Sequence, residues 1–117
     1  AEVQKVTVKT SLVTGKPAVI SAKASRQGTK RKVTVKFTVP KACDGTDWVL
    51  AKKVSQSEDG SYTYVSGYAY TKKNQTKTTV IFKNVKPGVY YLTGRAYVKG
   101  YAKNYTKWSE VKKVVVK

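Results

Sequence analysis

The stretch from residue 90 to residue 110 combines tyrosines, one tryptophan and several basic residues in the sequence YYLTGRAYVKGYAKNYTKWSE. Exposed aromatic rings can stack on sugar rings or on nucleic acid bases, and nearby cations attract anionic ligands. Tyrosines are also good strand formers that pair across strands, with lysine stems lying over their rings. The stretch therefore indicates either a ligand-binding surface or an ordinary solvent-facing sheet, and the remaining residues have to distinguish the two.

Alternation along residues 90–97 predicts which of these side chains point outward. If Tyr90 faces the core, the residues of opposite parity face away from it: Tyr91, Thr93, Arg95 and Tyr97. A loop follows this segment, with Trp108 at its end. Part of a second tyrosine group is also expected at the surface, namely Tyr62, Tyr64, Tyr68 and Tyr70. The candidate ligand-binding residues are Arg95, Tyr97, Tyr101, Tyr105 and Trp108.

Catalytic residue types are nearly absent from the chain. It contains no histidine and a single cysteine, Cys43, so it can form neither an internal disulfide nor a catalytic Cys–His pair. The six acidic residues are scattered, and four of them lie in the turn-like sequences CDGTD (43–47) and SEDGS (57–61), where Asp side chains usually cap the backbone. We therefore expect no enzyme activity, no metal site and no cofactor.

The charge is strongly positive, with 24 Lys+Arg against 6 Asp+Glu and a formal net charge of +18. This balance favours an anionic partner: nucleic acid, an acidic membrane, or the anionic polymers of a Gram-positive cell wall. Lysines also solubilise β-rich domains and protect their edges. Nucleic acid is disfavoured because the chain has few arginines and they are dispersed. No apolar run approaches the roughly 18 residues of a transmembrane segment.

Hydrophobic periodicity is 2 rather than 3.6, as in KVTVKFTV at 32–39. Strands are predicted at 3–9, 18–24, 31–39, 47–54, 61–70, 77–83, 89–98 and 108–116. Gly, Pro and Asp turn signals separate them, which favours an all-β antiparallel sandwich of about seven or eight strands. Residues 15–117 form this domain, and residues 1–14 are an extra strand or a linker from a preceding module. Because methionine is absent, we expect a piece of a longer protein.

The segment NVKPGVYYLTGRAYVKGYAKNYTKWSEVKKVVV (84–116) resembles a fibronectin type III domain, an immunoglobulin-like sandwich. It is most similar to the lysine- and tyrosine-rich modules of secreted and surface proteins of gut Firmicutes. The resemblance implies a corner tyrosine at Tyr90, or at Tyr91 if the register slips by one residue. It also implies inward positions for Trp48 and Leu50 in TDWVLAKKV (46–54), and Phe37 in place of the usual tryptophan.

Gly94 departs from the family pattern, which buries a β-branched residue at that position. We expect a large ring to fill the gap, either Trp48 or Tyr64.

For function, the resemblance implies a non-catalytic structural or adhesive module of a larger extracellular bacterial protein, secreted or attached to the cell wall. Its partners would be neighbouring domains of the same polypeptide, which the module would position at the cell surface. The alternative is a module that binds a polysaccharide or an anionic cell-wall polymer through the exposed aromatic residues and lysines. Fold alone does not decide between these roles.

Overall fold

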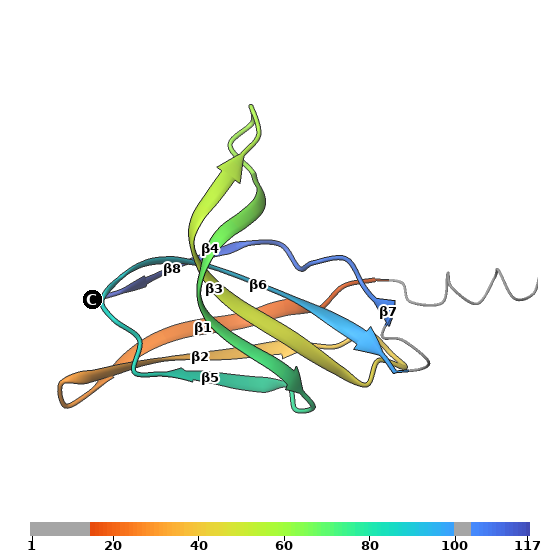
Figure 1. The fold of residues 1–117 in the computed structure, drawn as a ribbon, viewed down its shortest axis with the longest axis horizontal. Coiled ribbons are helices and arrows are strands. Elements are labelled where there is room, and N and C mark those ends of the chain that lie inside the picture. Colours follow the sequence, from red (N-terminus) through yellow and green to blue (C-terminus); the bar gives the residue numbers. More distant parts are fainter. Residues whose placement is uncertain (1–14, 100–103) are drawn as a thin grey trace, which may run out of the picture.

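The computed structural model of the chain describes residues 15–99 and 104–117, which form two antiparallel β-sheets (Figure 1). The first sheet has the strand order β1-β2-β5, with β1 at Ala18–Gln27, β2 at Lys30–Thr38 and β5 at Thr79–Lys83. The second has the order β4-β3-β6-β7, and β8 also pairs with β6. Its strands are β3 at Gly45–Gln56, β4 at Tyr62–Gln75, β6 at Gly88–Val98, β7 at Asn104–Tyr105 and β8 at Lys112–Val116. The predicted all-β antiparallel sandwich is confirmed.

Most predicted strands are found within a few residues of their expected bounds. The prediction succeeds because apolar residues that alternate along a strand all point toward the core, so the alternation marks where each strand lies. The last predicted strand, 108–116, is wrong in part. Residues 106–111 are not paired as a strand, and the regular structure there is confined to β7 and β8. The predicted strand at 3–9 lies outside the described residues. Within the described part of the chain, no helix is long and apolar enough to cross a membrane.

The core lies between the two sheets and is built from the inward-facing residues of each. Val33, Val35 and Phe37 come from β2, and Trp48 and Leu50 come from β3; each is at most 1% exposed. The rings of Phe37 and Trp48 lie 4.6 Å apart at their centroids, so the two sheets meet through an aromatic contact. The predicted inward positions of Phe37, Trp48 and Leu50 are confirmed.

The start of β6 has the predicted corner geometry. Tyr90 is 2% exposed, and its hydroxyl donates a hydrogen bond of 2.7 Å to the carbonyl of Lys86. The backbone N–H of Lys86 in turn donates to the hydroxyl of Tyr70 at 3.0 Å. Burial, and then the hydrogen bond with Tyr70, raise the pKa of Tyr90 above its ordinary value. Tyr90, rather than Tyr91, is therefore the residue that fixes the bend into β6.

The hairpin formed by β3 and β4 continues beyond the sandwich as an arm that rises away from both sheets (Figure 1, yellow and green). Its pairing is interrupted between Leu50 and Ala51, and again between Ser55 and Gln56. Tyr62, Tyr64, Tyr68 and Tyr70 share one parity, so a regular strand would place all four on the same face. The irregularities separate them: Tyr70 packs against the core, whereas Tyr64 and Tyr68 stay largely exposed.

Candidate functional site

Tyr97 does not lie on the surface, and the prediction that it faces solvent is wrong. It pairs with Gly45 across β6 and β3, and its side chain is 1% exposed. A Cβ atom at position 45 would collide with the Tyr97 ring, so the glycine makes room for that ring to lie over its backbone. The ring of Tyr105 covers it from another side, with centroids 6.3 Å apart. Tyr97 therefore cannot offer its ring to a ligand.

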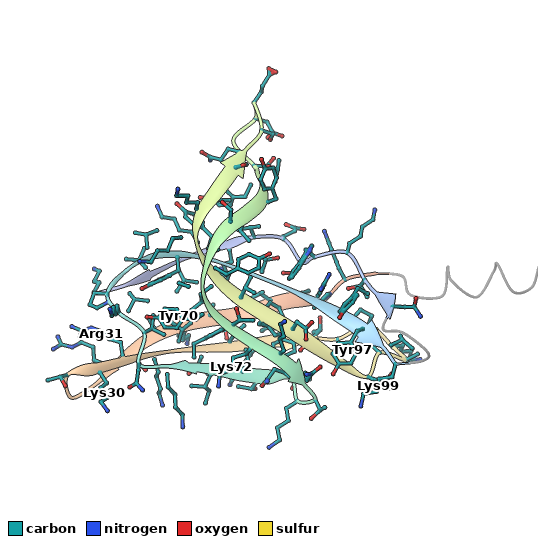
Figure 2. All side chains as sticks on the ribbon, in the orientation of Figure 1. Lys30, Arg31, Tyr70, Lys72, Tyr97 and Lys99 are labelled. Atoms are coloured by element: carbon teal, nitrogen blue, oxygen red, sulfur yellow. The ribbon has the colours of Figure 1, made fainter. Side chains whose placement is uncertain are left out.

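Alternation did predict the correct face of β6 for Tyr97, namely the face turned away from the core between the sheets. Tyr97 is accordingly not part of the core cluster. What the sequence did not reveal is that β3 begins at Gly45, two residues before its predicted start. Burial raises the pKa of the Tyr97 hydroxyl, and the negative charges of Asp47 and Asp44 raise it further. Figure 2 shows Tyr97 beside Lys99, at the end of β6.

Arg95 lies between two of the predicted site residues. Its guanidinium carbon is 3.6 Å from the ring centroid of Tyr105 and 4.7 Å from that of Trp108. Contacts of this kind are worth about 0.5–2 kcal/mol, depending on how much water is excluded. The Nε atom of Arg95 is buried without a hydrogen-bond partner. Arg95 thus contacts both rings, and both remain partly open to solvent, with Tyr105 39% exposed and Trp108 37% exposed.

The segment that carries Trp108 is attached to β6 through hydroxyl groups. The backbone N–H of Ala96 donates to Thr106 Oγ1 at 3.0 Å, and that of Gly94 donates to Ser109 Oγ at 3.1 Å. The backbone N–H groups of Thr106 and Ser109 donate back to the carbonyls of Ala96 and Gly94. These side-chain acceptors take the place of strand carbonyls, which explains why residues 106–111 follow β6 without forming a regular strand.

This attachment has a sequence signal that was missed. Two aromatic–hydroxyl pairs, Tyr105-Thr106 and Trp108-Ser109, occur three residues apart. In each pair the hydroxyl binds the backbone of β6, and the aromatic residue contacts Arg95. Three residues of this segment thus span a two-residue step on β6, from Ala96 to Gly94, and the extra residue is consistent with the lack of regular strand pairing there.

Trp108 lies next to the arm, where it lines a shallow hollow of about 120 Å³ together with Tyr64 and Tyr68. The exposed fractions of these side chains are 65% for Tyr64, 55% for Tyr68 and 37% for Trp108. Thr63 and Ser109 add hydroxyl groups to the lining. We call Tyr64, Tyr68 and Trp108 the aromatic groove. This groove contains one of the predicted site residues, Trp108, together with two tyrosines of the arm, Tyr64 and Tyr68. Another predicted site residue, Tyr101, lies outside the described residues.

The acidic residues near the sheet ends bind backbone groups. Asp44 accepts a 2.6 Å hydrogen bond from the N–H of Lys99, and Asp47 accepts one of 2.9 Å from the N–H of Asn74. Asp59 accepts from the N–H of Ser61 at 2.9 Å in the turn of the arm. Across residues 15–99 and 104–117, no three His, Cys, Asp or Glu side chains are grouped as metal ligands would be. These three carboxylates therefore stabilise turns and strand ends by accepting hydrogen bonds from the backbone.

No protein-family model matches the sequence, and no curated protein matches it either. The resemblance to fibronectin type III domains accordingly stays a prediction. In residues 15–99 and 104–117, the structure establishes a sandwich of two antiparallel sheets with eight strands.

Proposed function

We propose that the chain is a non-catalytic adhesive module, of the fibronectin type III kind, within a larger secreted or cell-surface bacterial protein. Its ligand is a polysaccharide whose sugar rings stack on the aromatic groove. The module also positions the neighbouring domains of its polypeptide. The observation that carries the proposal is the convergence of three exposed aromatic side chains, two from β4 and one from the segment before β8, on a single hollow.

The chemistry of the groove suits a sugar. A sugar ring has apolar faces and hydroxyl groups around its edge, and tyrosine and tryptophan combine apolar rings with polar tips. The hydroxyl of Thr63 lies in the same lining as the rings. The same sheet also exposes Val89, Tyr105 and Val115, but Tyr64, Tyr68 and Trp108 are the exposed rings that line one hollow together.

The size of the hollow favours a chain over a small free ligand. Pockets that enclose a drug-sized molecule measure roughly 300–1,000 Å³. The aromatic groove measures about 120 Å³, so it holds one ring while the rest of a polymer lies over the open surface. Weak single contacts of this kind give useful attachment when they are repeated along a polymer or across several modules. An adhesive role fits such repetition.

The proposal is tested by affinity electrophoresis of the whole chain in gels that contain a panel of neutral and acidic bacterial and plant polysaccharides. Retardation by at least one of them is expected. Tyr64→Ala and Trp108→Ala should each weaken the affinity that causes this retardation at least fivefold, since a stacking aromatic ring contributes about 1–3 kcal/mol.

The matched control is Ile20→Ala, which removes an apolar side chain from β1 that is 67% exposed and distant in sequence from the groove. It should leave the retardation unchanged. Absence of retardation by every polysaccharide would overturn the binding proposal and leave a spacer that only positions its neighbours. An equal loss of retardation in Ile20→Ala and Trp108→Ala would also overturn the proposal, because the binding would then not depend on the aromatic groove.

A further inference from the structure

The sheet β1-β2-β5 carries seven basic residues and no acidic residue. The basic residues are Lys23, Arg26, Lys30, Arg31, Lys32, Lys36 and Lys83. The acidic residues of the described chain lie elsewhere: in the loop before β3, in β3 itself, in the turn of the arm and at Glu110. The Oε2 atom of Glu110 is 3.9 Å from the Nζ atom of Lys16. No acidic side chain on this sheet therefore balances the positive charge of its seven basic residues.

Strand pairing brings like charges directly opposite each other. Lys32 of β2 faces Lys83 of β5, and Arg31 of β2 faces Arg26 of β1. Like charges that lie directly opposite each other destabilise a sheet, and no described carboxylate forms an ion pair with Lys32 or Lys83. A bound anion between the two ammonium groups would turn this repulsion into attraction.

The opposed lysines border a hollow of about 400 Å³. Its lining is Lys30, Arg31, Lys32, Ile81, Lys83 and Asn84. Figure 2 shows Lys30 and Arg31 at the end of the molecule where the β1–β2 turn lies, far along the sandwich from Tyr97. We call Lys30, Arg31, Lys32 and Lys83 the basic hollow.

Arg31 is held in place within this hollow. Its Nε donates to the carbonyl of Lys117 at 2.6 Å, and Nη1 donates to the carbonyl of Thr29 at 2.9 Å. Its own carbonyl accepts from the N–H of Val85 at 2.9 Å. A guanidinium has five N–H donors, so these two side-chain bonds fix its position and still leave donors for a ligand.

We propose that the basic hollow is a second binding site, for the phosphate or sulfate esters of an anionic polysaccharide. Neighbouring strands are about 4.8 Å apart, and residues that share a face repeat about every 7 Å along a strand. Lysines at these spacings neutralise single ester groups as point charges. The hollow has no aromatic lining on which bases could stack, which favours a polysaccharide over a single-stranded nucleic acid.

This site does not depend on the proposed function, because the aromatic groove is formed by the other sheet and its flanking segment. The two sites would bind different features of a polymer: the groove takes a sugar ring, and the hollow takes an acidic ester. A variant of one site should therefore leave binding at the other intact, which lets a failure of either proposal be recognised separately.

The test measures binding of the whole chain to fluorescently labelled dextran sulfate, to a phosphate-bearing mannan and to neutral dextran at several salt concentrations. The double variant Lys32→Gln/Lys83→Gln is compared with Lys72→Gln/Lys73→Gln, which removes two exposed lysines from β4 and the same total charge. Loss of affinity for either acidic polymer should be at least tenfold in the first variant and less than twofold in the second. The slope of log affinity against log salt should also fall by about one to two units in the first variant.

Preference for dextran sulfate or for the phosphate-bearing mannan identifies which ester the hollow takes, and Tyr64→Ala should keep the parent chain's preference for either acidic polymer over neutral dextran. Equal losses in the two lysine variants would overturn the proposal in favour of diffuse charge attraction. Tighter binding of a single-stranded DNA of equal charge at about 0.15 M salt, lost in Lys32→Gln/Lys83→Gln, would overturn the choice of polysaccharide.

Discussion

Trp48 and Gly94 lie directly opposite each other on β3 and β6, and the indole of Trp48 occupies the space that a side chain at position 94 would need. This relationship answers the question that the glycine raised in the sequence: Trp48, and not Tyr64, fills the gap. The indole Nε1 donates to Thr46 Oγ1 at 3.0 Å, so the ring is buried without leaving its polar atom unpaired.

Gly94→Ala should destabilise the fold by about 1–3 kcal/mol, the usual cost of overpacking a filled core. The free energy of unfolding in urea, followed by circular dichroism, measures this loss. In the background of Trp48→Phe the smaller ring leaves room, so the added methyl group should cost less than half as much. Identical costs in both backgrounds would show that the indole is not the obstacle.

Ser109→Ala should destabilise the chain by about 1–3 kcal/mol, because it leaves the buried N–H of Gly94 without an acceptor. It should also loosen the segment that holds Trp108, which would shift the fluorescence of that tryptophan to longer wavelength. Ser66→Ala, an exposed change on β4, is the control and should stay within about 0.5 kcal/mol of the parent. A Ser109→Ala variant as stable as this control would contradict the hydroxyl attachment.

Asp59 should titrate with a pKa of about 2, lowered first by the hydrogen bond from Ser57 and then by those from Ser61. Since the folded pKa lies below the unfolded value of about 3.9, this contact stabilises the turn of the arm above that value. The contribution is lost as the pH falls toward 2. Carboxyl chemical shifts measured by NMR across this range test the pKa directly. Ser57→Ala should raise it, and an unchanged titration in that variant would refute the assigned cause.

Several features of the fold could be predicted from the sequence because they depend on local pattern. Alternation located the strands, and turn residues separated them. The corner role of Tyr90 and the inward position of Trp48 were also predicted correctly, from the resemblance of the surrounding sequence to fibronectin type III domains.

The binding surfaces could not be predicted, because they depend on irregular pairing and on contacts between distant strands. The interruption of the β3–β4 ladder between Leu50 and Ala51 places Tyr68 and Tyr64 on the opposite face from Tyr70, and only the first two are exposed. Lys32 and Lys83 look dispersed in the sequence and become neighbours only when β2 pairs with β5. The burial of Tyr97 likewise requires Gly45 to lie opposite it, which the expected start of β3 excluded.

The central claim is that a polysaccharide lies on the aromatic groove, and the two tryptophans allow a direct measurement. Trp48 is fully buried and Trp108 is 37% exposed, so Trp48→Phe leaves Trp108 as the only tryptophan reporter. Acrylamide quenching of this variant is measured with and without the polysaccharide that retards the chain most in the electrophoresis panel. We predict that the ligand lowers the quenching constant at least twofold and shifts the emission to shorter wavelength. Unchanged quenching at saturating polysaccharide would contradict the claim.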